Sequence, residues 1–416
     1  MLLFLGCHVA GPLDPDATIG STPTAGGPTY WADVRPLLDR NCARCHNDGG
    51  QAPSFDAAEA AQALAPLMAA YTAEGRMPPA APDPSCAEYG GSDRFVVEDG
   101  EKATLAAWAD AGAPLGDPAD YVAAPTDAIS TAPFDLELHG TTPYHPACGD
   151  DGNDYRCFVL DVGNTSALYL TGLEALVDND AIVHHIVLFE LLDGGYTGDG
   201  TADPHDGFAC SGLGEPGWDF LAAWGPGANP MTFPENSGMR LPKDAHLVLQ
   251  MHYFASSTEA GEQSDQSGYG LHLADHVDRR VEQYLLGATW FTIPADEAAY
   301  SVTEYIPWGG ADMEVLGVWP HMHVLGSGFD ERLVRADGSE SCLLHQDRWD
   351  FHNQVWAPLV TPEPVTSGDT IQITCTWDNS AQNPAQPDDP PQDVPFGEET
   401  GNEMCVGFTY LVEPEG

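Results

Sequence analysis

The feature that most constrains the fold is how often turn-forming residues interrupt the apolar runs of this chain. From about residue 130 to the end, short runs rich in Val, Ile, Leu, Phe and Tyr alternate with Gly, Pro, Asn and Asp. Such runs are typical of β-strands, because a stable helix needs a longer uninterrupted stretch. The chain has 416 residues, which is too many for a single hydrophobic core. We therefore expect a mainly β protein with more than one domain.

The N-terminal part of the chain has a different pattern. Ala-rich segments at residues 56–73 and 98–112 predict helices, and both lie within residues 29–120. Residues 1–28 are rich in Gly, Pro, Asp, Ala and Thr, which predicts a flexible tether. Residues 121–135 have a similar composition and predict a linker. The expected order is a tether, a small helical domain, a linker and a β-rich body.

The helical segment contains the motif Cys-x-x-Cys-His, formed by Cys42, Cys45 and His46. In c-type cytochromes the two thiols of this motif bond covalently to haem, and the histidine binds its iron. Met77, which is followed by two prolines, is the expected sixth iron ligand, with Met68 as an alternative. A disulfide between the two cysteines is the competing interpretation of the motif.

A second motif, Trp-x-x-x-Gly-Ala-Pro, ends the helical segment at residues 108–114. With this ending, residues 29–120 resemble a small bacterial cytochrome c domain. The resemblance implies that haem c is a cofactor of the protein.

Histidines stand inside or beside three strand-like apolar runs, where polar side chains need a reason. On a strand, residues i and i+2 face the same side, so His321 and His323 present two imidazoles together. His184 and His185 are adjacent and should face opposite sides. These two can share a metal only if the strand twists or if they use different ring nitrogens. With His252, they would form an all-imidazole site suited to copper or zinc.

A methionine extends the second pair of histidines. Met404 precedes Cys405 and the last apolar run of the chain. Thioether sulfur favours Cu(I), so two imidazoles and Met404 would form a softer site than three imidazoles.

The order and local context of these six residues resemble those of the copper type II, ascorbate-dependent monooxygenases. That family has peptidylglycine α-hydroxylating and dopamine β-monooxygenase branches. The resemblance covers roughly residues 130–413 and implies two packed, jelly-roll-like β-sandwich domains, over residues 136–278 and 279–416. Each domain would hold one copper ion.

The resemblance also implies a role for each ligand residue. One copper transfers electrons, and its ligands would be His184, His185 and His252. The other copper binds O2 and is catalytic, and its ligands would be His321, His323 and Met404. Gln250 matches a glutamine that stands two residues before the third histidine in the family. Family disulfides imply two pairs, Cys375–Cys405 and Cys157–Cys210.

The sequence departs from the peptide-hydroxylating branch at the substrate positions. An arginine that binds the peptide carboxylate there corresponds to Trp319, and a tyrosine that assists it corresponds to Phe408. These two residues and Trp308 indicate an apolar or aromatic substrate rather than a glycine-extended peptide. Aromatic residues near a strand are, however, often part of the core.

We therefore expect a copper-dependent monooxygenase that hydroxylates a C–H bond of a small organic substrate with O2. Electrons would come from ascorbate or another donor, and the haem domain would relay them. The alternative is a copper- and haem-containing electron-transfer protein, or a copper-binding protein, without oxygenase activity.

Charge and cysteines limit the partners and the compartment. Against 64 Asp and Glu there are 14 Lys and Arg, a net charge of −50, which disfavours binding to nucleic acid and anionic lipid. Ten cysteines scattered among turn-rich segments favour disulfides in an oxidising compartment. With Cys7 and the haem pair set aside, seven remain, and Cys86 is the expected free thiol.

The first residues resemble the end of a bacterial export signal. An apolar run leads to Gly6-Cys7, which is similar to a lipoprotein cleavage site and implies a lipid anchor on Cys7. We therefore expect an extracytoplasmic bacterial protein that is periplasmic, an outer-membrane lipoprotein or secreted.

Overall fold

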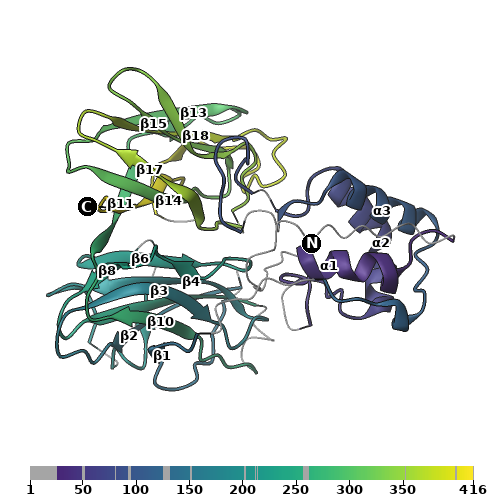
Figure 1. Ribbon diagram of the computed structural model, residues 1–416, viewed down its shortest axis with the longest axis horizontal. Helices are drawn as coiled ribbons and strands as arrows, with labels where there is room; N and C mark the ends of the chain where they lie inside the picture. Colours follow the sequence, from purple (N-terminus) through teal and green to yellow (C-terminus); the bar gives the residue numbers. More distant parts are fainter. Residues whose placement is uncertain are drawn as a thin grey trace. The chain divides into compact units, whose positions relative to one another are not determined.

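The computed structural model describes most of the chain after the N-terminal segment (Figure 1). The described residues are 26–48, 52–79, 81–91, 95–124, 132–149, 152–200, 203–210, 212, 214–255, 262–351, 353–398 and 401–415. The expected tether and the lipid-anchor residue Cys7 therefore lie outside the described residues.

The chain forms two compact units. A helical unit combines Met1–Ala81, Gly91–Ala132 and Gly225–Asn229. A larger β unit combines Pro82–Gly90, Pro133–Trp224 and Pro230–Gly416.

The helical unit contains the two helices that the Ala-rich segments predict. Its elements are the π-helical turn η1 (Tyr30–Val34), α1 (Arg35–Asn41), α2 (Ala58–Ala73), α3 (Asp99–Asp110) and the 3-10 turn η3 (Pro118–Asp120). A capping box joins Glu98 and Glu101 at the start of α3, so the first backbone N–H groups of that helix have acceptors. Tyr30 and Trp108 are fully buried and close the core between the helices.

The N-terminal half of the β unit is built on a five-stranded antiparallel sheet with the order β5-β2-β9-β4-β6. Its strands are β2 (Asn153–Asp161), β4 (Val183–Leu191), β5 (Phe208–Ala209), β6 (Trp218–Trp224) and β9 (His246–Phe254). The central strand β9 is almost entirely buried, which explains its long apolar run.

The C-terminal half contains a four-stranded sheet with the order β13-β18-β15-β16. These strands are β13 (Tyr300–Pro307), β15 (Gly326–Val334), β16 (Glu340–Gln346) and β18 (Thr370–Trp377). A two-stranded sheet joins β12 (Thr292–Ile293) and β19 (Val394–Pro395).

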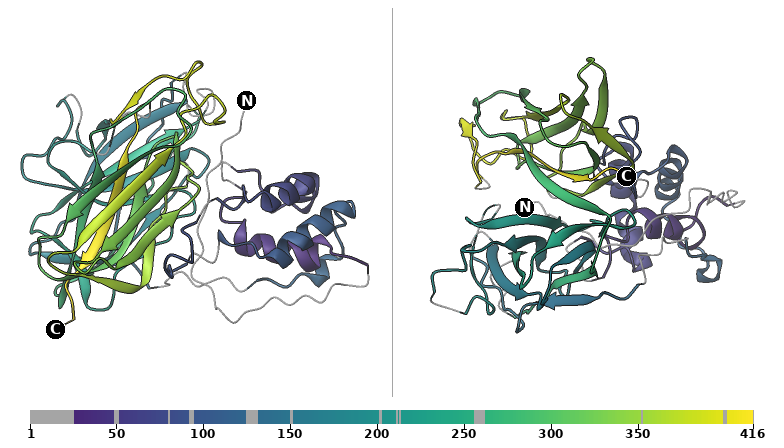
Figure 2. Two further views of the ribbon diagram at one scale, coloured as in Figure 1. Left: turned by 90° about the horizontal axis from the view of Figure 1, so that it is seen from above. Right: turned by 60° about the vertical axis from the view of Figure 1, so that its left-hand side comes forward.

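A nine-stranded sheet runs through both halves of the β unit, which form two lobes in Figure 2. Its N-terminal strands are β1 (Leu136–His139), β3 (Leu168–Leu176), β7 (Met231–Thr232), β8 (Ser237–Leu241) and β10 (Gly268–Ala274). Its C-terminal strands are β11 (Arg279–Ala288), β14 (Met313–His321), β17 (Ala357–Val365) and β20 (Cys405–Val412). The halves join where β8 pairs in parallel with β11.

Side chains also cross between the two halves. The ring of Phe220 on β6 stacks on Phe408 of β20 at 3.9 Å between centroids. The hydroxyl of Tyr410 on the same strand donates to the Leu221 carbonyl at 2.7 Å. The shared sheet and these buried contacts fix one half of the β unit against the other.

A strap formed by residues 82–90 belongs to the β unit, although it lies between α2 and α3 in sequence. Its backbone pairs with the edge strand β17, since Gly90 N donates to Pro358 O and Val360 N donates to Glu88 O, both at 2.9 Å. The side chain of Tyr89 is 4% exposed. The strap thus satisfies backbone groups of an edge that would otherwise be open to pairing.

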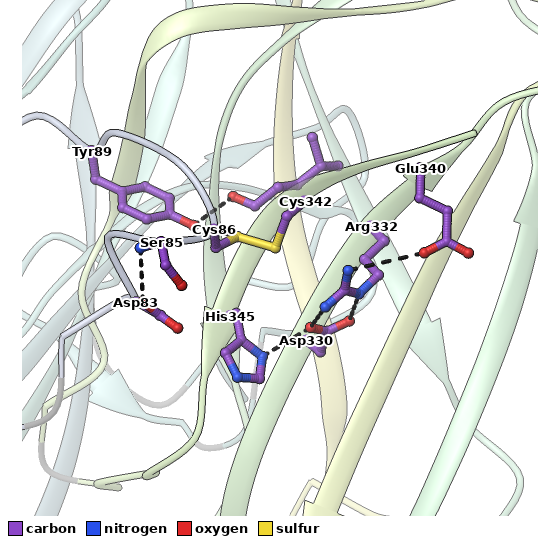
Figure 3. Close-up of a disulfide and its surroundings, with 10 residues drawn as sticks. Asp83, Ser85, Cys86, Tyr89, Asp330, Arg332, Glu340, Cys342 and His345 are labelled. Atoms are coloured by element: carbon purple, nitrogen blue, oxygen red, sulfur yellow. Dashed lines mark hydrogen bonds and ion pairs between the residues drawn. A yellow bond between two sulfur atoms is a disulfide. The ribbon is translucent and has the colours of Figure 1, made fainter.

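A disulfide links the strap to the C-terminal half (Figure 3). Cys86 bonds to Cys342 on β16, and the hydroxyl of Tyr89 donates to the Leu343 carbonyl at 3.1 Å. The prediction that Cys86 is a free thiol was therefore wrong. Its partner stands 256 residues later, and nothing in the local pattern indicates that the strap crosses to that strand.

The other two disulfides of the β unit are those that the family resemblance implied. Cys157 pairs with Cys210 and Cys375 pairs with Cys405, so that β2 and β20 are each braced to a neighbouring segment. Three disulfides fit an oxidising compartment. Among the described residues, no helix combines the length and the apolar character needed to span a bilayer.

The strap disulfide predicts that the two units stay covalently joined after the linker is cut. A protease recognition sequence inserted between Tyr121 and Val122 provides the cut. After cleavage, the chain should run as one species on a denaturing gel without reductant and as two fragments with reductant. The matched variant Cys342→Ser should give two fragments in both lanes, and two fragments from the parent chain without reductant would contradict the prediction.

Candidate metal sites

Three histidine rings meet at one point of the five-stranded sheet. The Nδ1 atoms of His184, His185 and His252 are 3.1–3.2 Å from one another. His184 and His185 lie on β4, and His252 lies directly opposite His185 on β9. Among the described residues, these three form the one group of at least three His, Cys, Asp or Glu side chains whose ligand atoms lie within 4.8 Å of one another.

An irregularity in β4 explains how adjacent histidines reach the same side. The register between β4 and β9 shifts between Val183 and His185, so His184 is the extra residue of a bulge. A bulge turns the affected side chain out of the usual alternation of strand faces. The expectation of opposite faces therefore fails here, and both rings present the same nitrogen rather than different ones.

The ring of His252 is held from the side away from its neighbours. Its Nε2–H donates to Asn153 Oδ1 at 2.7 Å, so in the neutral ring Nδ1 carries the lone pair. The ring also stacks on Tyr155 at 4.1 Å. A hydrogen bond of this kind fixes both the tautomer and the orientation of a metal-binding histidine.

These distances fit a shared metal ion. Nitrogens bound to one ion at about 2.0–2.1 Å can be at most about 4.2 Å apart. The N–H of the neutral His252 ring is used by Asn153, so its Nδ1 carries a lone pair that a metal ion can accept. A cation at the centre would satisfy all three Nδ1 atoms, and three imidazoles suit copper or zinc.

Gln250 is buried on β9, two residues before His252. Its Nε2 is 3.9 Å from Cys210 Sγ, next to the Cys157–Cys210 disulfide.

The second group of predicted ligands lies where β14 ends and β20 begins. His321 is the last residue of β14 and is paired with Val406 of β20, which places it near Met404. His323 lies just beyond the strand, so the two histidines are not successive same-face residues of one strand as predicted. Their rings are nearly perpendicular and 5.1 Å apart. His321, His323 and Met404 are all buried.

Hydrogen bonds leave Nε2 as the lone-pair atom of both rings. Nδ1–H of His321 donates to Gln354 Oε1 at 2.6 Å, and Nδ1–H of His323 donates to the Asn402 carbonyl at 2.9 Å. The Nε2 atom of His321 is buried without a hydrogen-bond partner. A buried polar atom without a partner is costly unless a ligand satisfies it, so this atom fits a metal-binding role.

Burial keeps His321 neutral. Desolvation, together with His323 and His185, lowers its pKa to about 3 against the raising effect of the Gln354 hydrogen bond. Only a neutral imidazole can donate its lone pair to a metal.

Glu403 is a residue of this site that the sequence reasoning did not single out. It is fully buried, and its carboxylate accepts hydrogen bonds from His323 N and Met404 N. Burial raises its pKa to about 7, and these hydrogen bonds act in the opposite direction. Its position directly before Met404 was visible in the sequence, but the fold alone reveals its contacts.

Two of the three aromatic residues expected near the substrate, Trp319 and Phe408, are paired across β14 and β20, with their ring centroids 5.3 Å apart. The ring of Trp319 is stacked parallel to His321 at 5.7 Å, and its Nε1–H donates to Gln354 O. Phe408 is fully buried against Phe220 and belongs to the contact between the two halves.

Trp308 lies away from the histidines. Its ring packs on Tyr284 and lines the same cleft as Met313, the first residue of β14. His321 ends that nine-residue strand, about 25 Å away at the usual rise of a strand. Trp308 is therefore a core residue and not a candidate for contact with a substrate at His321.

The helical unit contains an apolar cleft that holds the predicted haem ligands. The five residues named for this role all line it: Cys42, Cys45, His46, Met68 and Met77. The Nδ1–H of His46 donates to the Pro53 carbonyl at 2.9 Å, which leaves Nε2 available. Burial lowers the pKa of His46, and the ring is stacked on Phe55. An apolar cleft with a neutral, oriented imidazole fits a haem.

The two cysteines of the motif differ in state. Cys42 is a free thiol whose pKa burial raises to about 12, whereas Cys45 is in a disulfide. The competing Cys42–Cys45 disulfide is therefore not formed.

Comparison with protein families gives matches to both halves of the β unit. Residues 146–260 match the copper type II ascorbate-dependent monooxygenase N-terminal domain, and residues 291–414 match the C-terminal domain. Together these matches cover more than half of the chain.

Curated relatives point to the same family. Dopamine beta-hydroxylase of Canis lupus familiaris is 26% identical over 254 residues, which cover 56% of this chain and 38% of that protein. Dopamine beta-hydroxylase of Homo sapiens is 25% identical over 281 residues, which cover 62% of this chain and 43% of that protein. The chain thus spans less than half the length of these relatives.

The geometry of the three-histidine group predicts how it responds to loss of Asn153. Asn153→Ala removes the acceptor that orients His252, and loss of such a partner weakens metal binding about 10–100-fold. Copper affinity measured by competition with a chelator should therefore fall by this factor for one ion per chain. The control is His246→Ala. His246 lies on β9, as His252 does, but its ring bonds to Asp161, so this substitution should leave the affinities for both copper ions unchanged. Equal affinities in the Asn153 variant and the parent chain would refute the assignment.

Proposed function

Because the chain belongs to the copper type II, ascorbate-dependent monooxygenase family, we propose that it hydroxylates a C–H bond of a small organic molecule with O2. In this reaction R–H, O2, two electrons and two protons give R–OH and water. The observation that carries the proposal is the separation of the six ligand residues into two groups in one β unit. One group offers three Nδ1 atoms, and the other offers two Nε2 positions beside a methionine.

A copper ion in each group would supply one electron at a time. The ion in the second group would also react with O2. His184, His185 and His252 would hold the electron-transferring ion. His321, His323 and Met404 would hold the ion at which O2 and substrate react. Three protein ligands leave room for a further ligand, as in other catalytic metal sites.

The protein's own residues prepare the second group for this role. Gln354 and the Asn402 carbonyl hold the two imidazoles in the tautomer that exposes Nε2. Burial keeps His321 neutral and excludes water. The soft sulfur of Met404 favours Cu(I) over Cu(II).

The residues near His321 support an apolar substrate. Trp319 stacks on the His321 ring at the position where the peptide-hydroxylating branch has an arginine. An indole offers no charge partner for a carboxylate, but it offers a flat apolar surface. We therefore assign to Trp319 the recognition of an apolar or aromatic part of the substrate.

Substitution of Met404 tests the assignment of the reactive site. Loss of a residue that only hydrogen-bonds to a metal ligand lowers activity about 10–100-fold. Met404→Ala removes a ligand itself, so kcat should fall by at least this factor. The three-histidine group should still bind one copper ion. Met322→Leu is the control, because Met322 lies between the two histidines but its side chain belongs to the hydrophobic core. Full turnover by Met404→Ala would contradict the proposal, as would copper-dependent O2 consumption that yields no hydroxylated product.

We also propose that the helical unit binds haem c and passes electrons to the three-histidine copper, in place of ascorbate or as a relay from it. The support is the apolar cleft with its oriented His46, together with the covalent link of both units in one chain. Linking a donor to its acceptor raises the effective concentration of the donor. The three disulfides support an extracytoplasmic location.

The relay predicts that copper accelerates the oxidation of the haem. In stopped-flow absorption, reduced haem in the copper-loaded chain should reoxidise faster than in the copper-free chain. His252→Ala should remove the acceleration, because it disrupts the proposed acceptor. A haem that reoxidises at the same rate in all three samples would exclude the relay.

A further inference from the structure

Glu403 is a fully buried carboxylate in the C-terminal half of the β unit. Burying a charged carboxylate is costly unless hydrogen bonds replace its water. At this position the replacement is extensive, because four N–H groups donate to the two oxygens. The identity of these donors indicates what the residue does.

Two of the donors belong to proposed copper ligands, and they share one oxygen. Oε2 of Glu403 accepts from His323 N at 2.9 Å and from Met404 N at 3.3 Å. The backbones of a histidine ligand and of the methionine ligand are thus held by the same atom, although the two residues are far apart in sequence.

The other two donors fix the carboxylate itself. Trp377 Nε1–H donates to Oε2 at 2.9 Å, and Leu325 N donates to Oε1 at 2.7 Å. Trp377 is the last residue of β18 and is fully buried, so it cannot follow a shift of Glu403 easily. The carboxylate therefore connects the ends of β14 and β18 to the start of β20.

The neighbours of Glu403 reinforce the same connection. The carbonyl of Asn402 accepts from the His323 ring, and Met404 follows Glu403 directly. Cys405, the next residue, is bonded to Cys375 on β18. Residues 402–405 thus form one short segment that holds an imidazole, supplies a thioether and is anchored by a disulfide.

We propose that Glu403 is a positioning residue that fixes the Met404 thioether relative to the His321 and His323 imidazoles. This inference rests on the proposed copper role of those ligands. A glutamine in its place would have one acceptor oxygen, and its NH2 group would face N–H donors. In one orientation of the amide, the NH2 group meets Leu325 N, which lies 2.7 Å from Oε1, and in the other it meets the three donors of Oε2. Two donors cannot pair, so the side chain must shift, and the methionine would no longer be held beside the histidines.

The chain provides a matched control in Glu331. This residue is also fully buried in the C-terminal half, but it accepts a hydrogen bond from Thr409 Oγ1, at 2.8 Å, and Thr409 is not part of a ligand segment. Burial raises its pKa to about 8, so it too resides in a strongly desolvated place. Glu331→Gln therefore reports the general effect of replacing a buried carboxyl group in this core.

The experiment compares the full-length parent chain, Glu403→Gln and Glu331→Gln, each loaded with Cu(I). X-ray absorption should detect sulfur scattering from one copper ion in the parent and in Glu331→Gln. In Glu403→Gln this signal should be lost or weakened, and the affinity for that ion should fall about 10–100-fold. The copper of the three-histidine group should be unchanged in all three, which shows that the fold is intact.

The possible results separate the two proposals. Sulfur scattering and affinity that are equal in Glu403→Gln and the parent would overturn the positioning role and leave the proposed function standing. A parent chain without copper–sulfur scattering would overturn the proposed ligand role of Met404 itself. If Glu403→Gln does not fold, Glu403→Asp takes its place, since it keeps the charge but is one methylene shorter. Parent-like scattering and affinity in that variant would equally overturn the positioning role.

Discussion

The pairing of β14 with β20 is the constraint on which the candidate reactive site depends. These strands bring residues near 321 and residues near 404 together, with His321 opposite Val406 and Pro320 opposite Gly407. One strand end supplies the imidazoles and the other supplies the thioether, so the proposed set of three ligands needs both. The pairing is in turn held by β11 on the far side of β20, by the Cys375–Cys405 disulfide and by the carboxylate of Glu403. Chemistry at this site is therefore a property of the long sheet and not of a local motif.

The two histidine groups differ in which ring nitrogen is left to bind a metal ion. Both need neutral rings with a lone pair aimed inward. In the first group an amide oxygen outside the cluster fixes Nε2–H of His252 and frees Nδ1. In the second, Gln354 and the Asn402 carbonyl fix Nδ1–H and free Nε2. The ring nitrogen that remains available is thus set by where the nearest oxygen lies, which no sequence pattern around the histidines reveals.

Much of the organisation could be predicted from the sequence, because it depends on local patterns. Ala-rich segments gave α2 and α3, interrupted apolar runs gave the β-rich body, and the six predicted ligands fall into two spatial groups. The missed features depend on long-range contacts or on irregular backbone. A bulge at His184 reversed the expected face of one ring, and β14 ended before His323. Trp308 was named as one sign of an apolar substrate, but it packs on Tyr284 in the hydrophobic core, which is the other interpretation that the sequence allowed. Cys86 and Glu403 have partners that only the folded chain brings near.

The strap of residues 82–90 has a consequence for the order in which the protein is made. Its partners are β16, β17 and Cys342, which leave the ribosome about 250 residues later. The helical unit can bury its own core early, since domains fold as units during synthesis. The segment between α2 and α3 cannot make the Cys86–Cys342 bond or cover the side chain of Tyr89 until the C-terminal half has formed. Correct pairing of Cys86 is therefore a late event in maturation, and it marks a chain whose C-terminal half is already folded.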